Sequence, residues 1–207
     1  MRTHTQETQE TLTPEIAIQI LQEGNERFVR NLKANRNLLQ QVNETAAGQF
    51  PFAAILSCMD SRTSAELIFD QGLGDIFSIR VAGNVVNQDI LGSLEFACKA
   101  AGSKLVLVMG HTKCGAITGA VNQVEMGNLT SLLNKIKPAI EQVTETTDER
   151  AGKNDDFVQL VTEKNVHLTI NKIRQESPLL AEMEDQGNIK IIGALYDVET
   201  GIVKFFL

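Results

Sequence analysis

Short apolar stretches alternate with amphipathic segments through the middle of the chain. Three stretches rich in apolar residues and bounded by turn-forming residues predict strands. They lie at residues 52–58, 75–83 and 104–110. The intervening segments predict helices at residues 63–72, 89–102 and 114–124. Strands that alternate with helices in this way indicate an α/β fold with a central, mostly parallel β-sheet flanked by helices.

The N-terminal part predicts a helical arm followed by a connector. Residues 12–32 predict a helix, because Thr13 is a suitable cap and Pro14 suits the first helical position. We expect its apolar face at Ile16, Ile20 and Phe28. Residues 35–51 are polar and are interrupted by glycine and proline, so they predict an irregular connector.

The C-terminal part predicts two helices and a strand pair. The helices lie at residues 131–143 and 155–173, and two strands within 188–206 are joined by a turn at 198–201. A length of 207 residues fits one large domain or at most two small ones. We predict one domain over 1–207, with arm and connector at 1–48 and the α/β core at 49–207.

Composition narrows the class of protein. A net charge of −7 argues against broad nucleic-acid binding. No apolar run approaches the roughly 18 residues of a membrane span, and residues 1–15 lack the apolar core of a secretory signal. Three cysteines, an odd number without an export signal, favour thiolate chemistry or metal binding over disulfides. We therefore expect a cytoplasmic protein.

Reactive side chains follow two of the predicted strands. Cys58, Asp60 and Arg62 come directly after the first strand, and His111 and Cys114 follow the third. Side chains at the carboxyl ends of parallel strands meet at one edge of a sheet. Burying unpaired charges there costs several kcal/mol, so a metal, a substrate or an ion pair must compensate.

Two thiolates and one imidazole suit Zn2+. Cys58, His111 and Cys114 are three firm ligands, while Asp60 is a conditional fourth that can pair with Arg62 instead. Structural zinc usually has four protein ligands, and catalytic zinc has three plus water. The count therefore predicts a catalytic site in which zinc-bound water ionises near neutral pH and Asp60 orients it.

These residues resemble a known family. C-x-D-x-R followed by H-x-x-C, together with "RVAGN", "GSLEFA" and "GALYDVETG", is similar to the β-class carbonic anhydrases. The resemblance implies zinc on Cys58, His111 and Cys114, a catalytic Asp60–Arg62 dyad, and reversible hydration of CO2 to bicarbonate by a zinc-bound hydroxide. It also implies a homodimer or homotetramer with active sites at the subunit interface and an arm that embraces the partner.

The resemblance further implies substrate contacts and a subtype. Substrate-binding residues are expected at Gln49, Phe77, Ala82, Phe96 and Gly115. Gln49 stands nine residues before Cys58, as in plant-like members with an open site. Ile55 stands where bicarbonate-inhibited members have tryptophan. Both favour the open form, in which Asp60 is not a ligand, although Phe96 lacks the hydroxyl of the tyrosine found in plant-like members.

Other interpretations remain open from the sequence. The same scaffold can support hydrolysis of CS2 or carbonyl sulfide, and a zinc-binding module without turnover is a further alternative. Asp60 and Arg62 can form a structural ion pair, and Arg80 can face either an interior carboxylate or the site. We expect the residues with no role in the site to be Cys98, Lys113, His4 and His167.

Overall fold

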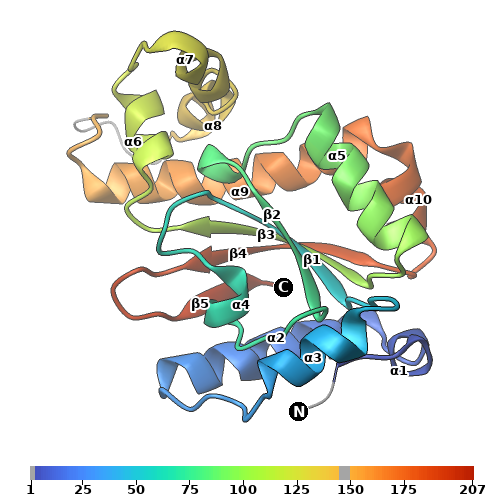
Figure 1. The fold of residues 1–207 in the computed structure, drawn as a ribbon. Helices are drawn as coiled ribbons and strands as arrows, with labels where there is room; N and C mark the ends of the chain where they lie inside the picture. The colour runs from blue at the N-terminus through green and yellow to red at the C-terminus, as the bar shows by residue number, and fades with distance from the viewer. Residues whose placement is uncertain (1–2, 145–149) are drawn as a thin grey trace.

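A computed structural model describes residues 3–144 and 150–207, and in these residues five strands form one sheet (Figure 1). The strand order is β2–β1–β3–β4–β5. The strands are β1 (Ala53–Ser57), β2 (Ile76–Arg80), β3 (Leu105–His111), β4 (Lys190–Tyr196) and β5 (Val203–Phe206). The first four strands are parallel, and β5 is antiparallel to β4. The predicted α/β fold with a C-terminal strand pair is confirmed.

Helices cover both faces of the sheet (Figure 1). One face carries α1 (Gln6–Glu10), α2 (Pro14–Val29), α3 (Leu38–Thr45) and α4 (Ala65–Ile68). The other carries α5 (Gln88–Glu95), α9 (Asp155–Glu176) and α10 (Pro178–Asp185). A third group packs beside the first half of α9: α6 (Gly115–Val121), α7 (Gly127–Leu133) and α8 (Lys137–Gln142).

Both faces of the central strands are buried, which explains their continuous apolar sequences. Ile55 of β1 packs in the same cluster as Leu21 of α2. Its neighbour Leu56 points to the opposite face and packs in the cluster that contains Ile170 of α9. All five residues of β1 are buried. The carboxyl ends of β1 and β3 therefore lie at the edge of a well-packed sheet.

The helix α2 begins as predicted but buries a different face. The Thr13 side chain accepts a hydrogen bond from the Ile16 N–H, and Pro14 is the first residue. Ala17 and Leu21 are fully buried, whereas Ile16 is 40% exposed. The other two predicted positions, Ile20 and Phe28, are only partly buried against the core.

Three further predictions were wrong in detail. The predicted connector contains α3, capped by the Asn37 side chain. The single helix predicted over residues 131–143 is divided into α7 and α8, because Pro138 has no N–H to donate to the preceding turn but suits the start of a new helix. The helix α10 was not predicted, although Ser177 followed by Pro178 is a typical start signal. The division into arm and core stays a prediction.

Gly24 lets α2 approach the loop after α4 closely. A Cβ at this position would lie 1.8 Å from the Phe69 carbonyl oxygen. We predict that Gly24→Ala lowers the free energy of unfolding by about 2 kcal/mol or more, because α2 must move away from the sheet. Urea denaturation measures this change.

Gly119→Ala in α6 is the matched control. Its added Cβ would meet Leu133 at an ordinary contact distance of 3.4 Å. Alanine in a helix interior is favoured over glycine by roughly 0.8–1.0 kcal/mol, so this variant should be neutral or slightly stabilised. Equal stability of the two variants would show that α2 is not held by this contact.

Candidate metal centre

Three potential metal ligands converge at the carboxyl ends of β1 and β3. Cys58 follows β1, His111 ends β3, and Cys114 is the N-cap of α6. Because β1 and β3 are adjacent, with Ser57 opposite Met109, residues 53 positions apart become neighbours. The two sulfurs and the imidazole nitrogen all lie within 4.8 Å of one another, and all three residues are buried.

The geometry of these three side chains fits zinc. The Cys58 and Cys114 sulfurs are 3.9 Å apart. Two sulfurs that each lie about 2.3 Å from one tetrahedral zinc ion are roughly 3.8 Å apart. His111 Nδ1 donates to the Thr112 carbonyl oxygen at 2.9 Å. That bond leaves a lone pair on Nε2, which is buried and has no hydrogen-bond partner among the described residues.

The two thiols of the centre share a proton. The hydrogen bond from the Cys114 thiol lowers the pKa of Cys58 to about 4, and the Gly83 N–H acts in the same direction. The same bond to Cys58, together with burial, raises the pKa of Cys114. The pair is thus partly ionised at neutral pH, and a divalent cation would stabilise both sulfurs as thiolates.

A tight turn after β2 directs a backbone donor at Cys58. The turn Ala82–Asn84 contains Gly83 at a φ of 67°. The Gly83 N–H donates to the Cys58 sulfur at 3.4 Å, and the Gly83 carbonyl accepts from Asn165 Nδ2 at 2.9 Å. A side chain at Gly83 would be strained by this φ and would meet Ile136 at 2.9 Å. Glycine is therefore required at this position.

Asp60 and Arg62 form a bidentate ion pair beside the centre. Arg62 donates from Nε and Nη2 to the two carboxylate oxygens of Asp60 at 2.9 and 2.8 Å. Arg62 Nη2 also reaches the Lys113 carbonyl at 3.3 Å. The Arg62 hydrogen bond holds the pKa of Asp60 well below its usual range. Asp60 is thus a carboxylate turned toward Arg62, outside the group of three converging ligand atoms.

Arg80 fixes the loop that carries these residues, a role the sequence left open. Its Nε donates to the Cys58 carbonyl at 3.2 Å and its Nη2 to the Asp60 carbonyl at 2.5 Å. The Thr63 hydroxyl also donates to the Cys58 carbonyl, at 2.8 Å. In the sheet register Arg80 at the end of β2 lies opposite Ser57 at the end of β1. Its position near the end of a predicted strand was the one signal in the sequence that placed it near Cys58.

The predicted substrate-binding residues fall into two groups. Ala82 lies in the turn that contacts Cys58, and Gly115 directly follows Cys114. In contrast, Gln49 lies before the start of β1 and Cys58 lies after its end. The strand between them is about 16 Å long. Phe77 pairs with Ala54 near the start of β1, and its ring lies 6.1 Å from that of Phe96. Within one chain, the second group does not reach the centre.

The residues expected to have no role in the site all lie outside the group of converging ligands. Burial raises the pKa of the Cys98 thiol to about 12. Lys113 forms an exposed ion pair with Glu199. His4 contacts Phe52 edge to face, and His167 stacks on Phe206.

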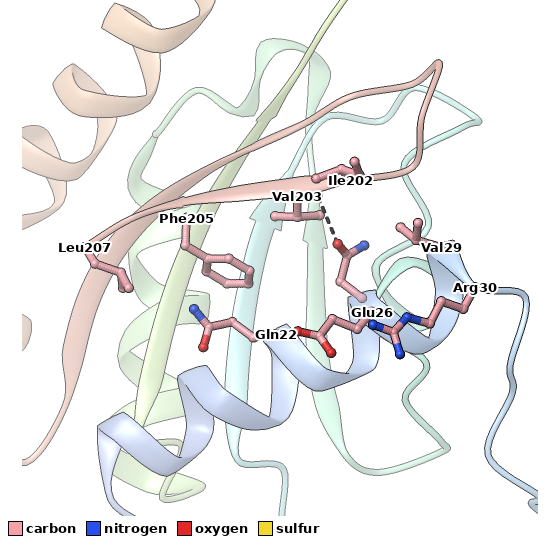
Figure 2. Close-up of a pocket in the computed structure, with 9 residues that line it drawn as sticks. Gln22, Glu26, Val29, Arg30, Ile202, Val203, Phe205 and Leu207 are labelled. Carbon is pink, nitrogen blue, oxygen red and sulfur yellow. Dashed lines mark hydrogen bonds between the residues drawn. The ribbon is translucent and has the colours of Figure 1, made fainter.

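A trough of about 600 Å³ between α2 and β5 is separate from the metal centre (Figure 2). It is lined by Gln22, Asn25, Glu26, Val29, Arg30, Ile202, Val203, Phe205 and Leu207. The Asn25 side chain accepts a hydrogen bond from the Val203 N–H at 2.9 Å, which joins the helix to the strand. None of the converging ligands lines this trough.

Comparisons with known proteins agree on one family. Residues 53–203 match the family model described as carbonic anhydrase. Carbonic anhydrase 2 of Mycobacterium tuberculosis is 35% identical over 91% of this chain and 90% of its own length. The crystal structure of the β-carbonic anhydrase CafA of Aspergillus fumigatus is 26% identical, with a TM-score of 0.72 over 93% of this chain and 89% of that chain. A tetrameric β-carbonic anhydrase of Sordaria macrospora shares the fold, at 23% identity and a TM-score of 0.70 over 81% of this chain and 89% of that chain.

Loss of a group that hydrogen-bonds a metal ligand weakens metal binding by about 10- to 100-fold, and loss of a ligand itself has a larger effect. We therefore predict that Cys58→Ser and His111→Ala each weaken zinc binding by more than about 100-fold. Chelator competition followed by metal analysis measures this change. Cys98→Ala is the matched control, since this buried cysteine lies in the core away from the centre. Loss of zinc from Cys98→Ala alone would contradict the ligand assignment.

Proposed function

The chain belongs to the β-class carbonic anhydrases, and from this membership we propose which of its residues perform the reversible hydration of CO2 to bicarbonate. The enzyme is a carbonate dehydratase. The observation that carries the proposal is the buried His111 Nε2, which has no hydrogen-bond partner in the part of the chain that the structure describes and belongs to a residue that converges with two thiols. Hydrolysis of CS2 or carbonyl sulfide is not favoured, since the relatives compared above are carbonic anhydrases.

Zinc is the proposed cofactor, held by Cys58, His111 and Cys114. When bound, it supplies a Lewis acid that lets water ionise near neutral pH. The chain's own contribution is to hold two thiolates and a neutral imidazole in a buried, fixed arrangement. The Gly83 N–H stabilises negative charge on Cys58, and the Thr112 carbonyl keeps the proton of His111 on Nδ1.

Asp60 is proposed to orient the attacking water. Its ionised side chain can only accept hydrogen bonds, and Arg62 donates to both of its carboxylate oxygens. The low pKa of Asp60 keeps it ionised between about pH 5 and 9, so it accepts a proton in a hydrogen bond throughout this range. The pairing with Arg62 favours an open resting site, in which Asp60 is not a ligand.

A second copy of the chain is proposed to complete the substrate pocket. Gln49, Phe77 and Phe96 lie at the opposite end of β1 from Cys58, so they can contact substrate only in the site of a partner. Phe96 is 58% exposed, and Phe77 lies on β2, the edge strand of the sheet. An exposed aromatic ring that contacts a half-buried one on an open edge strand is a suitable docking surface.

The helix α3 supports the same assembly. Leu38, Leu39 and Val42 are 57%, 73% and 48% exposed, whereas Gln41 is buried. A helix that packs only on the core of its own chain shows the opposite pattern, with apolar side chains buried and polar side chains exposed. Because α3 ends four residues before Gln49, a partner that covers these side chains would also approach Gln49. We therefore propose a homodimer, or a tetramer built from it as in the Sordaria enzyme.

A cytoplasmic location is also part of the proposal. Cys58, Cys98 and Cys114 are all free thiols, which fits a reducing compartment. In the residues that the structure describes, no helix is long and apolar enough to span a membrane.

Asp60→Asn should retain zinc and lower kcat/KM for CO2 by about 100- to 10,000-fold, because an amide cannot accept the proton of water as a carboxylate does. Stopped-flow hydration assays measure this effect. The wild-type rate should rise with pH, and the midpoint should persist in Asp60→Asn, since Asp60 does not titrate near neutrality. Wild-type activity in Asp60→Asn would refute this assignment, whereas a wild-type rate that is flat from about pH 6 to 9 would refute ionisation of a zinc-bound water.

The shared pocket can be tested by subunit complementation. Gln49→Ala should lower kcat/KM by roughly 100-fold or more, as expected for loss of one donor to the reacting oxygen. A heterodimer of Gln49→Ala and Asp60→Asn, isolated with two affinity tags, contains one intact site and should recover about half of the wild-type activity. A heterodimer no more active than its parent homodimers would exclude a pocket shared between subunits.

A further inference from the structure

The loop between β3 and α6 contains two of the three converging ligands in a strained conformation. His111 and Cys114 lie on either side of Lys113, which has a φ of 54°. A non-glycine residue in the left-handed region costs about 1–2 kcal/mol. Contacts from outside the loop must therefore hold this conformation.

The turn between β4 and β5 supplies such contacts through Thr112. The Thr112 hydroxyl donates to Asp197 Oδ1 at 3.2 Å and accepts from the Val198 N–H at 3.1 Å. The Thr112 N–H donates to the Tyr196 carbonyl at 2.9 Å. Thr112 is thus fixed both at its backbone and at its side chain.

Asp197 is the centre of this turn. Its Oδ1 also accepts from the Glu199 N–H at 3.0 Å, and its Oδ2 accepts from the Thr200 hydroxyl at 2.7 Å. The Gly201 N–H donates to the Asp197 carbonyl at 2.9 Å. The carboxylate that receives the Thr112 hydroxyl is therefore itself held at both oxygens.

The position of Thr112 determines how His111 is presented. The Thr112 carbonyl is the acceptor for His111 Nδ1, so rotation of that peptide would turn the ring or remove its partner. Groups that fix the second nitrogen of a metal-binding histidine strongly affect metal affinity. A second contact joins the loop to the same turn, the ion pair between Lys113 and Glu199. Both side chains are exposed, so this ion pair contributes little to the stability of the loop conformation.

We propose that Asp197 is a positioning residue that acts through the Thr112 hydroxyl to fix the imidazole of His111 toward the metal. The inference rests on the proposed zinc site, and it assigns the "YDVET" turn a part in metal affinity. Asp197 touches neither substrate nor metal in this role.

Zinc affinity, measured by chelator competition on the full-length protein, tests the proposal. Thr112→Val keeps the shape and the carbonyl but removes the hydroxyl, and it should weaken zinc binding by about 10- to 100-fold. Thr112→Ser retains the hydroxyl and should remain within about twofold of the wild type. Thr200→Val is the matched control, because it removes the other hydroxyl on Asp197 without touching the β3–α6 loop.

Three further results complete the test. Cobalt-substituted Thr112→Val should show a shifted ligand-field spectrum, which reports a displaced imidazole, whereas Thr200→Val should not. Wild-type zinc affinity in Thr112→Val would overturn the inference, and so would equal losses in Thr112→Val and Thr200→Val. Failure of the wild type itself to bind zinc would instead refute the proposed function.

Discussion

Two buried thiols and the His111 Nε2 nitrogen, which has no hydrogen-bond partner among the described residues, converge at one edge of the sheet, and the proposed site depends on this convergence. Buried polar atoms without partners are costly, and partial ionisation of the thiols adds negative charge to a poorly hydrated site. Cys58, His111 and Cys114 lie within 4.8 Å of one another because two adjacent parallel strands end together. The apolar sheet below them provides the rigid base that keeps their spacing fixed.

Two of the three proposed ligands, Cys58 and His111, are supported by outer elements. Arg80 on β2 holds the carbonyl of Cys58, the Gly83 turn donates to its sulfur, and the β4–β5 turn fixes the carbonyl that orients His111. The carboxylate of Asp60 is withdrawn from the centre by Arg62. These contacts hold the side chains that would bind zinc, and with Asp60 paired to Arg62 a bound ion would keep a position for solvent.

Much of the fold, and the convergence of the three proposed ligands, could be predicted from the sequence, because both depend on local patterns. Apolar runs locate the strands, and C-x-D-x-R and H-x-x-C stand where two of those strands end. The roles of Arg80 and Asp197 do not follow from local patterns, since Arg80 binds the carbonyls of Cys58 and Asp60 and Asp197 binds the Thr112 hydroxyl, all distant in the sequence. The exposed face of α3 was also missed, because the capping signal at Asn37 was outweighed by polar neighbours. The separation of Gln49 from Cys58 follows from the strand predicted between them, whereas the position of Phe77 required the register of β2 on β1.

Titration of the metal-free protein with zinc, with CO2 hydration measured on the same samples, tests the central claim most directly. Activity should rise in proportion to added zinc and reach its plateau at one ion per chain. Hydration that is independent of zinc, or a chain that binds one zinc ion tightly and yet never hydrates CO2, would contradict the account.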